Sequence, residues 1–169
     1  MTRECGSCSL CCKVMGIGEL GKAPGRWCDH FVRGVGCGAY GSRPGECRTF
    51  GCEWLLFEGW GPEWKPEKSR FVMITEEAGK RLKLVIDPAF PDVWRKEPYY
   101  SRLKHISKEA VNGRRVMIVI GARHIVIFPD ADHDLGALPD KAQIISGLLE
   151  TPMGLISFAR YEAAVAADT

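Results

Sequence analysis

Apolar residues follow one pattern in the first third of this chain and another in the rest. Beyond residue 66 they recur in short runs and at helical spacing, as in a conventional folded domain. Before residue 60 they show little periodicity. Between the two patterns, residues 60–66 read Trp-Gly-Pro-Glu-Trp-Lys-Pro, and the prolines and the glycine interrupt any helix or strand. The pattern therefore predicts two parts, residues 1–60 and 61–169, which we expect to pack as one compact unit.

The second part contains two pairs of apolar runs, each pair joined by a short segment with a glycine. The runs span residues 71–75 and 82–86 in the first pair, and 115–120 and 123–128 in the second. Gly79 lies in the first connection, and Gly121 suits the first position of a type II′ turn in the second. The second pair is apolar at successive positions, which is typical of strands buried on both faces. We therefore predict two β-hairpins.

A helix is predicted between the hairpins, whereas the end of the chain is ambiguous. Pro98 suits a helix start and Asn112-Gly113 a helix end. Between them, apolar residues recur at three- and four-residue spacing: Tyr99, Leu103, Ile106 and Ala110. Residues 143–150 and 155–161 suggest a third hairpin, with a C-terminal helix as the alternative. The whole pattern predicts an α+β protein, in which a loop-rich cysteine module packs on a mainly antiparallel sheet with one or two helices.

Composition excludes several classes of protein. At 169 residues, of which 46% are apolar, the chain has the length of one domain or of a domain with a small appendage. The net charge is +2, and no basic stripe with interleaved aromatics indicates nucleic-acid binding. No apolar run approaches the ~18 residues of a membrane span. The N-terminus lacks a leader of secretory type, so we expect a cytoplasmic protein without a membrane partner.

Cysteine is the residue whose distribution changes the picture most. All eight cysteines lie in the first 52 residues, and the other 117 residues contain none. They are Cys5, Cys8, Cys11, Cys12, Cys28, Cys37, Cys47 and Cys52. Such density indicates either a disulfide framework or a thiolate metal site. The cytoplasmic environment that we expect keeps thiols reduced, which favours metal.

Charge also favours a bound metal. Seven Lys/Arg and six Asp/Glu residues lie between Met1 and Trp60, so eight thiolates without a cation would bring this segment to a net charge near −7. A bound cationic centre offsets this charge, and metal binding itself drives the thiols to deprotonate. Five basic residues are expected to screen the remaining negative charge: Lys13, Arg26, Arg33, Arg43 and Arg48.

The spacing of the first four cysteines suits metal coordination. A Cys-x-x-Cys pair on a tight turn can direct both sulfurs at one ion, about 2.3 Å from each. Cys5-x-x-Cys8 is followed by Cys11 at the same spacing, and the adjacent Cys12 points elsewhere. Cys11 and Cys12 therefore indicate either two centres, or one ligand and one supporting residue. Four thiolates close a zinc site or hold an iron–sulfur cluster, so eight suffice for two centres, whose membership the sequence leaves open.

Two cysteine motifs together resemble a known family. C-x-x-C-x-x-C-C occupies residues 5–12, C-x-x-Y-x-x-R-P-x-x-C-x-x-F occupies residues 37–50, and Cys28 lies between them. This order is similar to the CxxCxxCC family, small bacterial cysteine-cluster proteins of the YkgJ type that are described as zinc- or iron-chelating. The resemblance covers about the first third of the chain, and Cys52 extends the pattern by one cysteine. It implies a metal-chelating role, but no substrate, reaction or protein partner.

Several other residues bear on this interpretation. Tyr40 and Phe50 are expected to pack over the cluster and limit access of water. His30 is a candidate nitrogen ligand, although the sulfurs suffice without it. The acidic residues 130–134 imitate a calcium loop but lack its final glutamate, so we interpret them as a solvated acidic turn. The apolar side chains of residues 54–57, Trp-Leu-Leu-Phe, are expected to be buried between the two parts.

We therefore predict a metal-binding protein that chelates one or two zinc ions, in a structural role or for storage and transfer. The alternative is a [4Fe–4S] cluster or another iron centre with an electron-transfer or enzymatic role, since four thiolates accept both. A partner-binding adaptor that uses a sheet edge is a third hypothesis, without an indicated partner. The chain has no Ser/His/Asp arrangement, phosphate loop or dinucleotide fingerprint, so nothing in it favours an enzyme.

Overall fold

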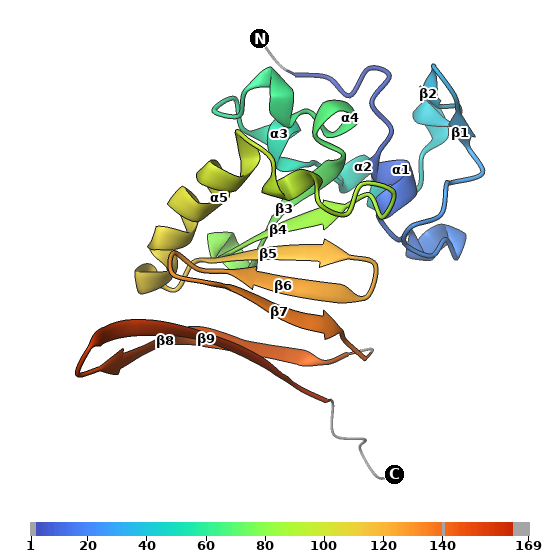
Figure 1. Cartoon of the computed structure of the whole chain (residues 1–169). Helices are drawn as coiled ribbons and strands as arrows, with labels where there is room; N and C mark the ends of the chain where they lie inside the picture. Colours follow the sequence, from blue (N-terminus) through green and yellow to red (C-terminus); the bar gives the residue numbers. More distant parts are fainter. Residues whose placement is uncertain (1–2, 140, 164–169) are drawn as a thin grey trace, which may run out of the picture. The chain divides into compact units, whose positions relative to one another are not determined.

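The computed structural model describes residues 3–139 and 141–163, and the chain divides into two compact units. The first unit comprises Met1–Ile74 and Leu84–Arg95, and the second comprises Thr75–Lys83 and Lys96–Thr169. The eight cysteines therefore all lie in the first unit. Short helices and mainly antiparallel strands make up the described residues (Figure 1), which confirms the predicted α+β class. None of the helices described is long and apolar enough to cross a membrane.

Apart from residues 71–74 and 84–86, which belong to two longer strands, the first unit is built from very short helices and one small hairpin. Its α-helices are α1 (Cys11–Val14), α2 (Gly45–Thr49), α3 (Glu53–Leu56) and α4 (Pro66–Ser69). Its 3₁₀ helices are Gly18–Leu20, Tyr40–Ser42, Pro62–Trp64 and Val93–Arg95. Its hairpin pairs β1 (Phe31–Val32) with β2 (Gly36–Cys37). Helices of four or five residues are not stable in isolation, so tertiary contacts must hold these elements in place.

Five strands form one sheet in the order β3-β4-β5-β6-β7 (Figure 1). They are β3 (Phe71–Glu76), β4 (Arg81–Ile86), β5 (Arg115–Ile120), β6 (Arg123–Ile127) and β7 (Asp132–Ala137). The pairs β5–β6 and β6–β7 are antiparallel. Gly121, between β5 and β6, has a φ of 59°, the sign that a type II′ turn requires at its first position. Both predicted hairpins of this sheet are present, and β7 is an addition that sequence analysis missed.

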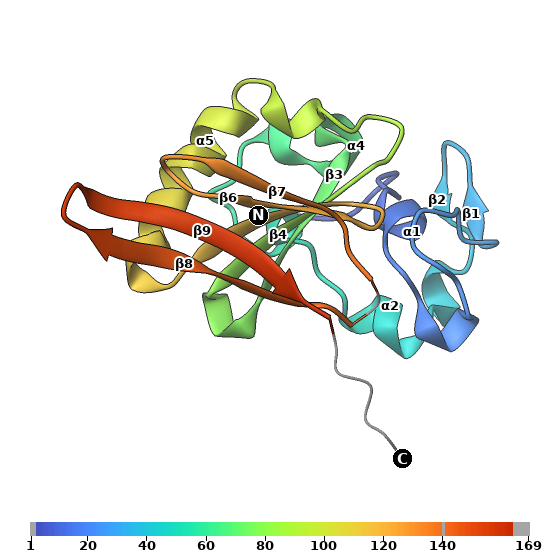
Figure 2. The ribbon, with the colours of Figure 1, turned by 60° about the horizontal axis from the view of Figure 1, so that its bottom comes forward.

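A helix and a long hairpin complete the second unit. Helix α5 (Tyr99–Ser107) continues into the 3₁₀ helix Lys108–Asn112, which ends at Gly113 with a φ of 79°. The predicted helix and its glycine stop are therefore confirmed. Strand β8 (Gln143–Thr151) pairs with β9 (Gly154–Glu162) along their whole length, as a separate two-stranded sheet. Figure 2 shows this hairpin beside β7, and β7 contacts β9.

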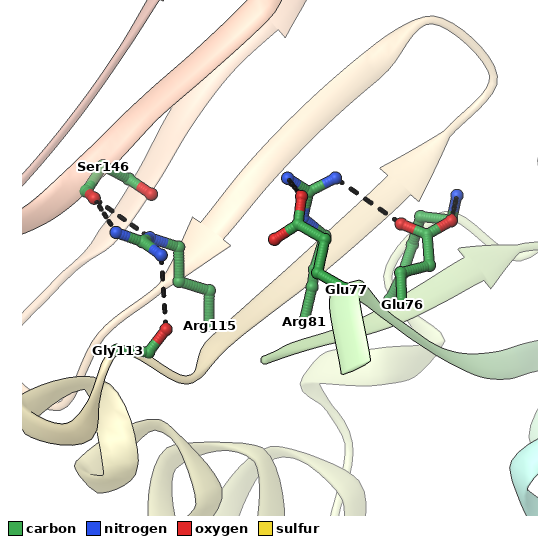
Figure 3. Close-up of polar contacts among 7 residues, drawn as sticks. Glu76, Glu77, Arg81, Gly113, Arg115 and Ser146 are labelled. Atoms are coloured by element: carbon green, nitrogen blue, oxygen red, sulfur yellow. Dashed lines mark hydrogen bonds and ion pairs between the residues drawn. The ribbon is translucent and has the colours of Figure 1, made fainter. Parts of the chain in front are cut away.

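Apolar packing and one arginine join the hairpin β8–β9 to the strands of the second unit. Met117, Val126 and Phe128 form a buried cluster, and apolar side chains of both β8 and β9 pack against it. Arg115, at the start of β5, donates from Nε and Nη2 to the carbonyl oxygen of Ser146 on β8, at 2.9 and 2.5 Å (Figure 3). Charge-assisted bonds of this kind are stronger than neutral ones, so they help to position β8.

Two expectations about the second half of the chain require correction. The alternative of a C-terminal helix is wrong, because residues 143–151 and 154–162 pair as a hairpin. The acidic residues 130–134 are not a solvated turn throughout, because β7 begins at Asp132. The carboxylate of Asp132 accepts a hydrogen bond from the Tyr100 hydroxyl at 3.0 Å and pairs with Lys104 Nζ at 2.9 Å.

The expected burial of residues 54–57 is also wrong for two of the four side chains. Leu56 and Phe57 are 70% and 57% exposed, because helix α3 ends at Leu56 and the chain continues in a loop. Trp54 is half-buried, and its indole nitrogen donates to the carbonyl of Gly61 at 3.1 Å.

We expect Phe128→Ala to destabilise the second unit by about 3–5 kcal/mol, because the side chain is 1% exposed and its removal leaves a cavity. Urea unfolding followed by far-UV circular dichroism measures this loss. Met153→Ala is the matched control, because Met153 is 98% exposed and its truncation should change stability by no more than about 0.5 kcal/mol. Equal midpoints for the two variants would contradict the assignment of this core.

Candidate metal centre

A tight turn and a backbone hydrogen bond gather the first cysteines. The amide of Cys8 donates to the carbonyl of Cys5 at 3.0 Å, and Gly6 in this turn has a φ of 55°. Glycine adopts this left-handed conformation without a steric penalty, so the Cys-x-x-Cys turn is well suited to its sequence. The amide of Cys28 donates to the carbonyl of Cys12 at 3.0 Å. This bond holds Cys28 next to helix α1, although residues 15–27 separate the two in the sequence.

The small hairpin β1–β2 links Cys37 to Cys28. The amide of Phe31 donates to the carbonyl of Cys28 at 2.9 Å, and Phe31 lies opposite Cys37 in the register of the two strands. Cys37 is therefore carried back to the part of the unit where Cys28 lies.

Two glutamates position the helix that carries Cys47. The amides of Gly45 and Glu46, at the start of α2, donate to the carboxylate of Glu19 at 3.0 and 2.6 Å. In return, the carboxylate of Glu46 accepts the amide hydrogen of Gly18 at 2.7 Å. These amides lower the pKa of Glu19, because hydrogen bonds to a carboxylate favour its charged form. The exchange of caps holds α2, and with it Cys47, against the loop that follows α1.

Cys52 differs from the other cysteines described so far, because it lies next to apolar residues. It immediately precedes helix α3. Cys52 and Cys11 both pack against a buried cluster of Leu10, Val14 and Val72. Its surroundings are therefore those of a core residue as much as those of a ligand.

The eight cysteines border two cavities. Seven of them line a cavity of about 160 Å³: Cys5, Cys8, Cys11, Cys12, Cys28, Cys37 and Cys47. Cys52 lines a smaller cavity of about 30 Å³ together with Cys5, Cys8 and Cys11. Tyr40, Phe50 and His30 also line the larger cavity. Tyr40 is 53% exposed, so it forms part of the rim and leaves water access to the cavity.

The cysteines are gathered without being bonded to one another. All eight are free thiols. In the part of the chain that the structure describes, no three His, Cys, Asp or Glu side chains are arranged so that they could already hold a metal ion. The site is thus a set of sulfurs around a common cavity.

The adjacent thiols of Cys11 and Cys12 differ in acidity. A hydrogen bond between their side chains lowers the pKa of Cys12 to about 7 and raises the pKa of Cys11, which burial raises further. The charges of Lys22 and Arg43 also lower the pKa of Cys12. Burial raises the pKa of three other thiols, those of Cys8, Cys47 and Cys52. Cys12 therefore deprotonates before Cys8, Cys11, Cys47 and Cys52 as the pH rises.

Lys22 is a cation of this site that sequence analysis missed. Its ammonium donates to three backbone carbonyl groups, those of Lys13, Met15 and Ala23. Burial lowers the pKa of Lys22, whereas negative charge at four cysteines acts in the opposite direction: Cys28, Cys12, Cys11 and Cys47. No motif surrounds Lys22 in the sequence, so only the folding of the loop after α1 reveals its position.

The basic residues that sequence analysis did single out have unequal roles. Arg43 lines the larger cavity, where its guanidinium lies 3.7 Å from the centre of the Tyr40 ring. Lys13, in contrast, pairs with Asp87 at 2.6 Å, and the carboxylate of Asp87 is almost fully buried. The charge of Lys13 is therefore offset by this carboxylate, and the expectation that it screens thiolates is not supported.

The donor set around the larger cavity fits a thiophilic metal. Sulfur is the main donor there, with one imidazole from His30 and one carboxylate from Glu46 that already accepts a backbone hydrogen bond. Soft thiolates select zinc and iron–sulfur clusters over magnesium and calcium, which require oxygen ligands. Apolar side chains such as Ile17 and Phe50 line the rest of the cavity, and a hydrophobic surround limits solvent access to metal–thiolate bonds.

Comparisons with known proteins give no significant match: no family model, no curated protein and no solved structure matches this chain. The likeness to the CxxCxxCC family therefore rests on the cysteine motifs alone and stays a prediction.

We expect Cys12 to react faster at neutral pH than Cys8, Cys11, Cys47 and Cys52 in the metal-free protein. Because the thiolate is the nucleophile, its alkylation by iodoacetamide should be half-maximal near pH 7, slow below that pH and fast above it. Peptide mass spectrometry after short exposure at a series of pH values measures this. In Cys11→Ala, which lacks the hydrogen-bond donor, the midpoint for Cys12 should move up toward that of an ordinary thiol. An unchanged midpoint in this variant would contradict the stated cause.

Proposed function

We propose that this chain is a metal-binding protein that chelates zinc through its cysteine cluster, in a structural role or for storage and transfer. The observation that carries the proposal is the convergence of seven cysteines, from four separate segments of the chain, on one cavity. The cysteine motifs that resemble the CxxCxxCC family support the same function. Both lines of support concern the thiols and leave the second unit without an assigned activity.

The chain's own residues prepare this cavity for a cation with several thiolate ligands. Cys12 has a pKa of about 7, so this thiol requires little additional driving force to become a ligand. Lys22 and Arg43 offset part of the negative charge that further thiolates would bring. When bound, zinc supplies the remaining positive charge and cross-links segments that otherwise contain only short elements.

An iron–sulfur cluster is the second candidate, because the size of the larger cavity favours a polynuclear centre over a single ion. A single zinc ion draws four sulfurs to about 2.3 Å and leaves no empty space between them. A cavity of about 160 Å³ has room for more than one metal atom. Two zinc ions would also fill this space. The cavity size therefore favours a centre with several metal atoms over a single ion, but it does not distinguish zinc from iron.

Anaerobic purification followed by elemental analysis and a visible absorption spectrum tests the proposal. We expect colourless protein with bound zinc, and Cys28→Ser/Cys47→Ser should lose at least half of it because two thiolate ligands are missing. Met153→Ser is the matched control, because it removes an exposed sulfur far from the cysteines in the sequence and should keep the full metal content. Brown protein that contains iron and sulfide would contradict zinc binding and support the second candidate, an iron–sulfur cluster. Wild-type protein that holds neither zinc nor iron after reconstitution would contradict the proposal of metal binding.

Removal of the metal should loosen the cysteine-rich segment selectively. If metal binding contributes to the folding free energy of the first unit, chelation should speed amide exchange at Cys28 and Phe31, whose hydrogen bonds hold the loops together. Amides in β5 and β6 should keep their protection, since these strands pack through Met117 and Val126. Hydrogen exchange before and after chelation measures both. Identical protection of residues 5–52 in the two states would be the contrary result.

A further inference from the structure

We propose that the eight cysteines form two neighbouring metal sites of four thiolates each. Site A consists of Cys12, Cys28, Cys37 and Cys47. Site B consists of Cys5, Cys8, Cys11 and Cys52. The division rests on the proposed metal-binding function and assigns the ligand sets that the sequence leaves open. It also explains why two cysteines are adjacent in the chain, since Cys11 and Cys12 then serve different sites.

The cavities provide the first argument. Among the described residues that line the smaller cavity there are four cysteines, and Cys52 is the one that the larger cavity does not share. The other three, Cys5, Cys8 and Cys11, line both cavities and so lie between them. We therefore assign Cys52 to one site with these three neighbours, which leaves four thiols for the larger cavity.

The adjacency of Cys11 and Cys12 agrees with this division. Adjacent cysteines cannot easily both bind one tetrahedral ion. Cys12 lines only the larger cavity, whereas Cys11 lines both cavities, so the two residues are assigned to different sites.

Backbone and packing contacts connect three members of site A and two pairs within site B. In site A, the Cys28 amide is bonded to the Cys12 carbonyl, and Phe31 links Cys28 to Cys37. In site B, one tight turn joins Cys5 to Cys8. Cys11 and Cys52 pack against one apolar cluster.

The two cavities differ in their linings. Among the described residues, Arg43 lines the larger cavity and not the smaller one. Four thiolates around one divalent ion leave two negative charges, which this cation offsets in part. The smaller cavity is lined by apolar residues such as Leu55, Pro66 and Val72. Both sites have the four thiolates that a closed zinc site or an iron–sulfur cluster requires.

Three double variants with equal numbers of lost thiols test the division. Cys28→Ser/Cys47→Ser removes two ligands of site A, Cys5→Ser/Cys52→Ser removes two of site B, and Cys28→Ser/Cys52→Ser removes one of each. After reconstitution with zinc, or with iron and sulfide, elemental analysis should give the first two variants half of the wild-type metal. The crossed variant, Cys28→Ser/Cys52→Ser, should retain no metal after gel filtration in the presence of a weak chelator, because each site then lacks one ligand.

The outcomes separate this proposal from the proposed function. Wild-type protein that binds no metal would remove both. Wild-type protein that binds metal, with equal loss in all three variants, would overturn the division and leave metal binding intact. A single cluster held by one set of four would leave one within-set variant fully loaded, which would also overturn it.

A measurement on the wild-type protein covers the case in which the variants fail to fold. Partial removal of the metal, followed by alkylation of the released thiols and intact-mass analysis, should reveal a species with four labels and half of the metal. Peptide mapping should assign those labels to site A alone or to site B alone. Labels that mix the two sets, or the lack of any four-label species, would overturn the division.

Discussion

The gathering of thiols around a common cavity is the constraint on which the first unit depends. Before β3, its α-helices have four or five residues and its hairpin strands only two, so regular hydrogen bonding contributes little to holding these segments in place. Long-range contacts take over this role: the Cys28–Cys12 backbone bond, and the reciprocal capping by Glu19 and Glu46. Each of them brings a cysteine toward the cavity.

The second unit depends on a different interaction. Its strands bury apolar side chains around Met117, Val126 and Phe128, and Arg115 bonds to the backbone of β8. Burial of this kind stabilises by roughly 25 cal/mol for each Å² of apolar surface and requires no cofactor. The first unit also buries large apolar side chains, such as those of Trp64, Phe71 and Trp94, but these lie outside its cysteine-rich segment, residues 5–52, where the described buried hydrophobic residues are Leu10, Val14, Ile17 and Cys28.

Charge connects the architecture of the first unit to its proposed role. Thiolates brought close together repel one another. The positive charges of Lys22 and Arg43 and the hydrogen bond between Cys11 and Cys12 reduce this repulsion. These groups offset only part of the charge that eight thiolates would carry. A cation at the cavity would complete the balance, which is the physical reason for preferring metal chelation to an inert cluster of thiols.

Local patterns determined much of this protein from its sequence. The hairpins and helix α5 were predictable because apolar periodicity and the turn residues Gly121 and Gly113 act over a few positions. The cysteines were identifiable as the site because their motifs are local as well. Strand β7 was missed, since its acidic residues depend on partners such as Lys104 that are distant in the sequence. Only the tertiary structure decided that Lys22 lies within electrostatic range of four thiols and that Cys52 and Cys47 line different cavities, because loops without periodicity are positioned by long-range contacts.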